Sequence, residues 1–293
     1  PALGAIAATG APGSSGVPDK ALLGRLGLLT NGSLDRTWTS ADGREHHYRT
    51  AGGTGALYHL ELYFVCADLA DLAAGVYHYS AIDHSLRQVR AGDFRAALSA
   101  ATGQEPSIAA APVVLAVTST FWRNSWRYRE RAYRHTFWDA GTSLSHILAV
   151  AAAAAVPATL VFGFADPLVN ALLDVEGTRE STVALVALGS TGTAAPPAPE
   201  VTRLDLPTQP LSSAEVTWHG LTAMHLASCL PTGADAELWR TRPWPRSPSP
   251  PTGPLTALRP LPTDELDTRP PEQIIMRRRS TRKYDTDVEI PFA

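Results

Sequence analysis

The stretch YRTAGGTGALYHLELYFV, residues 48–65, contains two adjoining patterns that decide the fold. In its second half Leu60, Leu62 and Phe64 alternate with Tyr63 and Val65, so both faces of an extended segment are apolar. This pattern predicts a strand in the middle of a sheet. The first half, GGTGAL, is rich in glycine but has neither the GxGxxG spacing nor the lysine of a phosphate loop, so it does not indicate nucleoside triphosphate binding.

Strand and helix patterns alternate on either side of this segment. An amphipathic helix begins at Lys20 and ends at Asn31, and a long helix is predicted from about Asp139 to Ala155, with Asp139 in its first turn. The remaining predicted elements are a hairpin (GVYHYSAIDHSLRQV), a short helix (AGDFRAALSAATG), a buried strand (APVVLAVTSTF), and two strands (TLVFGF and STVALVALG) that flank a helix (PLVNALLDV). We therefore expect an α+β domain over residues 20–192, with a central mixed or antiparallel sheet flanked by helices.

Composition and charge exclude several classes of protein. The chain has 293 residues, of which 44% are hydrophobic and 18% charged, as in a globular protein, and its net charge of -3 gives no general attraction to nucleic acid or anionic membranes. The most apolar run, residues 149–163, is interrupted by Pro157 and is too short to span a membrane, and the N-terminus lacks the pattern of a secretion signal. We expect a cytoplasmic protein without nucleic-acid or membrane partners.

Cysteine and histidine spacing does not predict a metal site. Cys66 and Cys229 lie far apart without a CxxC motif, so neither a disulfide framework nor a zinc site is indicated. The histidines form no HExxH motif, and we interpret them as solvated or as hydrogen-bonded within the core. The arginine-rich aromatic run FWRNSWRYRERAYRH is interpreted as a mixed helix with packed aromatic residues.

Three further segments flank the predicted domain. Residues 1–19 are mostly small and are expected to form a flexible leader. Residues 193–269 are rich in proline and are predicted to be a linker that contains one helix over about residues 212–230. Residues 270–293 begin a new pattern, in which a short helix after paired prolines leads into the basic cluster MRRRSTRKYD at 276–285.

The segment PPEQIIMRRRSTRKYD resembles the opening motif of the FMN-dependent nitroreductase family, in which a helix ends in an Arg-Arg-Ser-x-Arg-aromatic string. The resemblance implies that Arg278, Arg279, Ser280 and Arg282 hold the phosphate and ribityl chain of FMN. Guanidinium groups and a hydroxyl suit a phosphate chemically. The resemblance also implies that residues 270–293 begin a second nitroreductase domain. The alternative interpretation is a solvated basic helix end.

A second resemblance covers roughly residues 22–189. The quoted stretch is similar to the signature Pro-Ser-x-Gly-Ala-Leu-Tyr-Pro-x-Glu-x-Tyr of the SagB-type nitroreductases, the azoline dehydrogenases of pathways that modify peptides with thiazoles and oxazoles. Residues 128–177 resemble later segments of that branch. The matching positions are Gly55, Ala56, Leu57, Tyr58, Glu61 and Tyr63. The resemblance implies a tandem chain with a degenerate first half and a pseudo-dimer of halves, in which Gly53, Gly55, Ala56 and Leu57 form part of the FMN site.

The chain also departs from this signature. Gly52 and Gly53 stand at the positions of its proline and serine, so a hydroxyl donor is missing. Arg127 and Tyr128 stand where the branch has a Lys-Tyr pair that acts on substrate protons. Since arginine keeps its proton, Arg127 can orient an anion but is a poor base, and Tyr128 is the better candidate for handling a proton. No Arg-Arg-Ser string precedes the first domain.

These resemblances imply an FMN-dependent oxidoreductase that oxidises azoline rings to azoles in a ribosomally made peptide, with Tyr128 and Arg127 as catalytic residues. The expected partners are the peptide substrate, a cyclodehydratase, and a second copy or a tandem second half. One alternative is a non-catalytic half that serves as a scaffold or binds the peptide, as Gly53 and Arg127 suggest. Another is a nitro- or quinone reductase that uses NAD(P)H.

Overall fold

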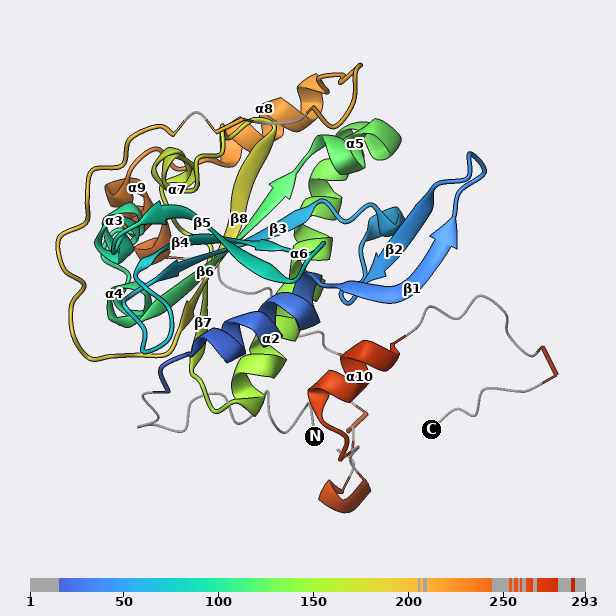
Figure 1. Ribbon diagram of the computed structural model, residues 1–293, viewed down its shortest axis with the longest axis horizontal. Helices are drawn as coiled ribbons and strands as arrows, with labels where there is room; N and C mark the ends of the chain where they lie inside the picture. The colour runs from blue at the N-terminus through green and yellow to red at the C-terminus, as the bar shows by residue number, and fades with distance from the viewer. Residues whose placement is uncertain are drawn as a thin grey trace.

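The centre of the structure is a six-stranded sheet with the order β5-β4-β3-β6-β8-β7, whose neighbouring strands are all antiparallel (Figure 1). The computed structural model describes residues 16–204, 206–207, 210–243, 253–254, 256–257, 259, 262–265, 268–278 and 286–287. The strands are β3 (Leu60–Cys66), β4 (Gly75–Ser80), β5 (Ser85–Ala91), β6 (Val113–Thr120), β7 (Ala158–Val161) and β8 (Glu180–Leu188). Because β3 pairs with β4 on one side and β6 on the other, the predicted interior strand is confirmed, as is the α+β class.

Helices cover both faces of the sheet. On one face, α2 (Lys20–Asn31) and α6 (Ala132–Ala153) enclose a core that includes Leu23, Leu62 and Ile147, all fully buried. On the other face, α3 (Arg95–Ala101), α4 (Pro106–Ala110) and α7 (Asp166–Leu173) enclose a second core that includes Val65 and Leu98. The strict alternation along β3 sends its odd- and even-numbered side chains into different cores, which explains why both of its faces are apolar.

The long helix α6 begins seven residues before the position predicted for it. Asp139 therefore lies inside the helix, and the prediction that it occupies the first turn is wrong. The buried residues Ala132, His135, Thr136 and Asp139 follow helical spacing, and no glycine or proline interrupts residues 132–138, so the helix extends back through this segment. As a consequence Asp139 points from the middle of a rigid element towards the loop that precedes β3.

The arginine-rich aromatic run does not form one continuous helix, because it is divided between α5, a short 3₁₀ turn and the start of α6. The helix α5 (Trp122–Tyr128) ends where Arg129 adopts a left-handed φ of 53°, and the short η2 (Arg129–Arg131) leads into α6. This break turns the chain, so that Tyr128 at the end of α5 packs edge-on against His135 of α6, with ring centroids 4.6 Å apart.

Several elements were not predicted. A two-stranded antiparallel hairpin, β1 (Ser33–Thr39) and β2 (Glu45–Arg49), projects from the body of the structure between α2 and the loop before β3 (Figure 1). The helices α4 and α9 (Gly233–Thr241) were also missed, because α4 has only five residues and α9 is mostly polar.

Segments beyond residue 192 pack on the domain. The predicted linker helix is shorter than expected and forms α8 (His219–Ser228), whose Leu221 packs with Phe121 and Ala132. Ile275 of α10 (Pro271–Arg277) belongs to the same core as Leu23 and Ile147, while η3 (Thr263–Glu265) is a single turn. The division into leader, domain, linker and second domain stays a prediction. Among the described helices, none combines the length and the apolar character that crossing a bilayer requires.

We predict that Ile147→Ala lowers the free energy of unfolding by about 2–5 kcal/mol, because the removed atoms leave a cavity where α6 meets the sheet. Ile82 is 94% exposed in the β4–β5 turn, so Ile82→Ala is a matched control that should change stability by less than about 0.5 kcal/mol. Chemical denaturation of both variants measures this. Similar losses in the two would contradict the placement of Ile147 in the core.

Candidate functional site

The loop between β2 and β3 has an unusual backbone. Gly55, Ala56 and Tyr58 have φ values of 63°, 55° and 48°, in the left-handed region that residues other than glycine rarely adopt. Each non-glycine residue held there costs on the order of 1–3 kcal/mol, so surrounding contacts have to hold the loop in place. The turn η1 (Thr54–Ala56) lies inside this segment. Strain of this kind is frequent at binding and catalytic sites.

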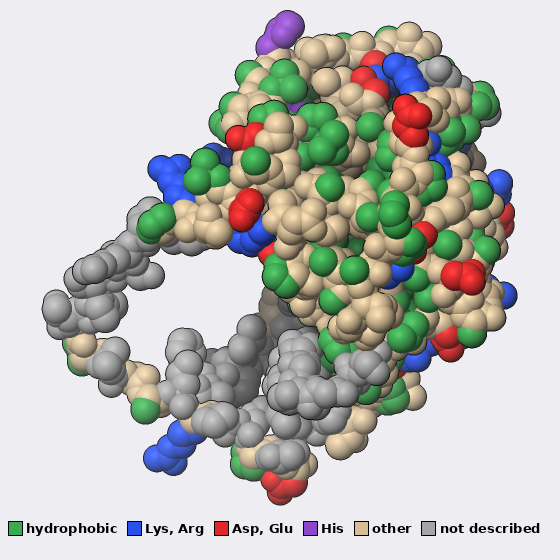
Figure 2. Space-filling model, turned by 90° about the vertical axis from the view of Figure 1, so that its left-hand side faces the viewer, with side chains coloured by type: hydrophobic (Ala, Val, Ile, Leu, Met, Phe, Trp, Pro, Cys, Tyr) green, Lys and Arg blue, Asp and Glu red, His purple; other side chains and the backbone are tan. Residues whose placement is uncertain are grey.

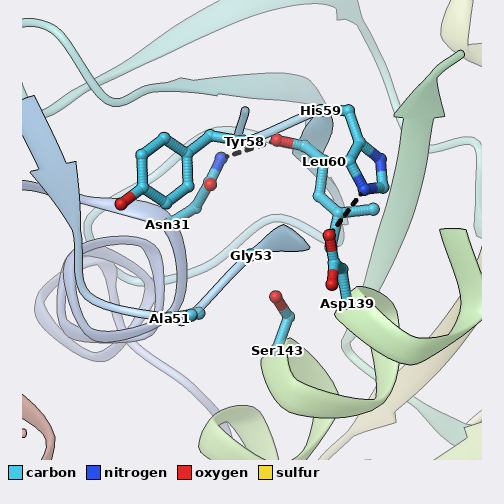
Figure 3. A pocket seen from close by; sticks show the side chains of 9 residues that line it. Asn31, Ala51, Gly53, Tyr58, His59, Leu60, Asp139 and Ser143 are labelled. Carbon is cyan, nitrogen blue, oxygen red and sulfur yellow. Dashed lines mark hydrogen bonds and ion pairs between the residues drawn. The ribbon is translucent and has the colours of Figure 1, made fainter. Parts of the chain in front are cut away.

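Asp139 of α6 anchors the loop. Its carboxylate accepts hydrogen bonds from the backbone N–H and the hydroxyl of Thr54, both at 2.8 Å. It also accepts one from Nε2 of His59 at 2.9 Å (Figure 3). His59 is fully buried, and its Nδ1 lies 2.9 Å from the hydroxyl of Ser119 on β6. Because a carboxylate only accepts, Nε2 carries the proton. The imidazole therefore links α6 to the sheet beneath the loop.

The hydrogen bonds to Asp139 also determine its ionisation. Burial of this carboxyl opposes the charged form, but the hydrogen bonds from His59 and from the backbone and side chain of Thr54 outweigh it. The pKa of Asp139 consequently lies below its ordinary value of 3.8. Asp139 therefore carries a negative charge at neutral pH and holds the loop as an anion.

A small pocket opens beside this anchor. Asn31 and Tyr58 form one wall, Ser143 and Asp139 of α6 form the facing wall, and the backbone at Gly53 lies between them (Figure 3). The amide of Asn31 donates to the carbonyl of Leu60 at 3.0 Å, which fixes its orientation. Neither Asn31 nor Ser143 was singled out in the sequence, because an isolated polar residue at a helix end or in a helix carries no pattern that marks it as functional.

The structure brings Arg278, at the end of α10, next to this pocket. A Cβ atom built on Gly52 would lie 3.4 Å from both terminal nitrogens of the Arg278 guanidinium. His146 of α6 is also nearby: burial is the largest cause that lowers its pKa, and the positive charge of Arg278 lowers it further. Of the predicted FMN-binding cluster, only Arg278 can be placed, since Arg279, Ser280 and Arg282 lie outside the described residues.

Tyr128 approaches the same loop from the other side. A Cβ atom on Gly55 would lie only 2.7 Å from the Tyr128 hydroxyl, so the two residues are in close contact. Arg127 is exposed, and its guanidinium carbon lies 5.7 Å from the centroid of the Tyr128 ring. The sequence-predicted residues Gly53, Gly55, Ala56 and Leu57 thus lie on one loop, with Tyr128 and Arg278 at different points of its border.

Next to the loop, at the start of β3, lies a partly buried charged network centred on Glu61. The Glu61 carboxylate pairs with Arg123 at 2.6 Å and with His78 at 3.3 Å. Burial opposes its ionisation, yet His78, Arg123 and Arg49 together lower the pKa of Glu61. Glu180, from β8, shows the opposite behaviour, since burial raises its pKa. Arg49 and Arg123 are further residues that the sequence patterns did not identify.

Several histidines have partners within the structure. His59 is satisfied in the core, His78 pairs with Glu61, and His84 lies 2.9 Å from the Tyr79 hydroxyl. Within the described part of the chain, no group of three His, Cys, Asp or Glu side chains has an arrangement that could hold a metal ion. Burial raises the pKa of the Cys66 thiol to about 12, so this cysteine is not a reactive thiolate.

The sequence model of the Nitroreductase family matches residues 47–190, which include the anchored loop, β3 and α6. A protein of Methanocaldococcus jannaschii assigned to the nitroreductases is 25% identical over 145 residues, covering 50% of this chain and 72% of its own. Residues 47–190 of this chain therefore form a nitroreductase-family domain.

Two solved structures agree with this fold. A nitroreductase structure from Anabaena variabilis is 28% identical with a TM-score of 0.60, and the match covers 73% of this chain and 45% of that one. One from Ralstonia eutropha is 18% identical with a TM-score of 0.52, covering 67% and 84%, and it supports the fold alone. The chain thus spans less than half the length of the Anabaena protein.

We predict that Asp139→Asn lowers the free energy of unfolding at neutral pH by about 1.5–3 kcal/mol, because the charged acceptor of three hydrogen bonds is lost. The folded pKa of Asp139 lies below 3.8, so this contribution is fully present above 3.8 and disappears as the pH falls through the folded pKa. Urea unfolding of both proteins over a pH series measures the difference. Asp68→Asn, at an exposed position, is the control. A difference that stayed constant into strong acid would contradict this assignment.

We also predict opposite effects for two glycine substitutions in the loop. Gly53 has an extended backbone (φ -133°, ψ 152°) and space for a Cβ atom, so Gly53→Ser should raise the free energy of unfolding by about 0.4–1 kcal/mol. Gly55 has φ 63° and would collide with Tyr128, so Gly55→Ser should lower it by at least about 1 kcal/mol. Thermal unfolding of the two variants tests this, and the same sign for both would refute it.

Proposed function

We propose that this chain is the first half of an FMN-dependent oxidoreductase of the SagB type, which oxidises azoline rings to azoles in a ribosomally made peptide. The observation that carries the proposal is the location of the signature residues. Gly55, Ala56 and Tyr58 lie on a strained loop that Asp139 holds in place, with Tyr128 against Gly55 and Arg278 against Gly52. The nitroreductase-family match over the same segment supports a flavin-dependent redox activity.

The residues around the loop have the chemistry to contact one side of an FMN group, whose body would lie outside the enclosed pocket, since that pocket has a volume of only about 10 Å³. Arg278 supplies a cation with several N–H donors, as a phosphate requires, and Gly52 and Gly53 leave the backbone uncovered for close approach. The Ser143 hydroxyl lines the same pocket and has no hydrogen-bond partner among the described residues, so it is available to a ligand. Arg279, Ser280 and Arg282 would complete the phosphate site, while Gly53, Gly55, Ala56 and Leu57 would form a wall of the flavin site.

FMN, when bound, accepts the hydride that an azoline ring loses on oxidation. The residues of this chain would orient the peptide and relay the accompanying proton to solvent, with a tyrosine hydroxyl taking up one proton as it releases its own. Tyr128 is the candidate for the proton, since its hydroxyl lies beside Gly55 at the border of the loop. Arg127 keeps its charge and is exposed, so we assign it to orienting an anionic part of the substrate.

Two other activities compete with this proposal. The missing serine hydroxyl at Gly53 and the exposure of Arg127 favour a non-catalytic half, which would act as a scaffold or bind the peptide for a catalytic partner half. A nitro- or quinone reductase that uses NAD(P)H has only the family match in its favour. In the first proposal, the partners are the peptide, a cyclodehydratase, and a second nitroreductase half from the same chain or from another copy.

We predict that Arg278→Ala weakens FMN binding about 10- to 150-fold, which corresponds to about 1.5–3 kcal/mol for a lost charged hydrogen bond to the phosphate. Fluorescence quenching of FMN by the chain measures the affinity. Arg277→Ala, at the exposed neighbouring position on α10, is the control and should leave the affinity unchanged. Equal affinities for FMN and riboflavin in the unmodified chain would argue against a phosphate site.

We further predict that Tyr128→Phe lowers the rate of azoline oxidation about 10²- to 10⁴-fold while FMN affinity stays the same, because only the hydroxyl that relays the proton is removed. The assay mixes the flavin-loaded protein anaerobically with a synthetic thiazoline peptide and follows the loss of flavin absorbance. Tyr48→Phe, on the β2 strand, is the control. If the unmodified protein binds FMN and the peptide but does not reduce its flavin, the scaffold interpretation replaces the catalytic one.

A further inference from the structure

A second cavity lies on the far side of the anchored loop from the candidate flavin pocket. It has a volume of about 300 Å³ and opens between β2, the loop and the first turn of α5. Its lining residues include His46, His47, Arg49, Leu57, Tyr58 and Arg123. Tyr58 lines both cavities, so the two adjoin at this residue. A ligand in this cavity would therefore lie beside the candidate redox site.

The charged groups that line this cavity are all cationic or can become so. Arg49 and Arg123 carry fixed positive charges, and His46 and His47 stand at its exposed rim. Glu61 is not a lining residue: it lies behind the wall, where it binds Arg123. The cavity thus presents positive charge to any entering molecule, although the chain as a whole has a net charge of -3.

Both arginines are held rigidly and still have donors to offer. Arg49 donates to the side chain of Asn31 at 2.6 Å and lies 5.7 Å from the centroid of the Tyr58 ring. Arg123 uses one terminal nitrogen for Glu61 and for the Tyr58 carbonyl. A guanidinium has five N–H groups, so each arginine keeps several donors for a ligand. Burial lowers the pKa of Arg49, which shows that its charge is poorly solvated in the free protein.

Resting on the proposed function, we propose that this cavity binds a carboxylate of the peptide substrate, on an acidic side chain or at its C-terminus. Two guanidinium groups on one cavity wall suit a carboxylate, which accepts paired hydrogen bonds from arginine forks. Ala56 and Leu57 supply an apolar border for the methylene groups that precede such a carboxylate. The site would hold the peptide next to Tyr58. An azoline ring close to the bound carboxylate would then lie near the candidate flavin pocket.

The test uses the full chain and three short probes that differ only in their carboxylates. The first is an acetylated, amidated Gly-Glu-Gly tripeptide, the second is the same peptide with Gln in place of Glu, and the third is the Gln peptide with a free C-terminus. Binding is followed by amide NMR shifts. We expect one carboxylate-bearing probe to shift the amide resonances of residues 47–49, 56–58 and 123. This probe should bind at least about tenfold more tightly than the uncharged probe.

Two variants locate the effect. Arg49→Gln and Arg123→Gln should each weaken binding of the preferred probe at least about tenfold. Arg87→Gln removes an exposed arginine paired with Asp83 and should leave this binding unchanged. Arg123→Gln also removes the arginine partner of Glu61, so thermal unfolding of each variant is recorded. If Arg123→Gln fails to fold, the result for Arg49→Gln decides the question.

The proposal is overturned if all three probes bind equally, if the shifts lie elsewhere, or if inorganic phosphate binds more tightly than both carboxylate probes. FMN affinity is measured on the same samples. If the unmodified chain binds the carboxylate probe but not FMN, the proposed function is refuted and this inference is not. Intact flavin binding without carboxylate discrimination would refute only this inference.

Discussion

The hydrogen bonds from Thr54 and His59 to Asp139 are the interaction on which the rest of the site depends. They join a strained loop to the middle of the longest described helix, and His59 extends the connection to Ser119 on the sheet. A loop with left-handed Ala56 and Tyr58 would relax without such a tether. The tether is therefore what holds the signature residues in a single arrangement.

This arrangement brings two chemically different cavities together at Tyr58. On one side of Tyr58 lies a small pocket bordered by Asp139, Ser143 and, through Gly52, Arg278. On the other side lies a cavity with arginine and histidine walls. The two proposed ligands, a flavin and a peptide carboxylate, would therefore lie close to one another beside the same loop. The unpredicted β1–β2 hairpin provides Arg49 and the two histidines, so it has a chemical as well as a structural contribution.

The helix α10 directly precedes the basic cluster and packs on α2 and α6. Its Ile275 is buried in the core beneath α2 and α6, which positions Arg278 at the pocket. The first arginine of the predicted FMN-binding cluster, Arg278, therefore lies beside the pocket. The side chain of Arg278 thereby reaches Gly52 of the loop before β3, more than 200 positions earlier in the chain.

The sequence by itself determined the interior strand β3, the α+β class and the nitroreductase-like signature, because alternation and local spacing reflect contacts within a short segment. Only the tertiary structure decided that Asp139 belongs to the interior of α6 and binds Thr54, 85 residues earlier in the chain. The same holds for Asn31, His59, Arg49 and Arg123, which are single polar residues without a repeating pattern. Their roles depend on which segments the sheet and its helices bring together, and that is a property of long-range packing.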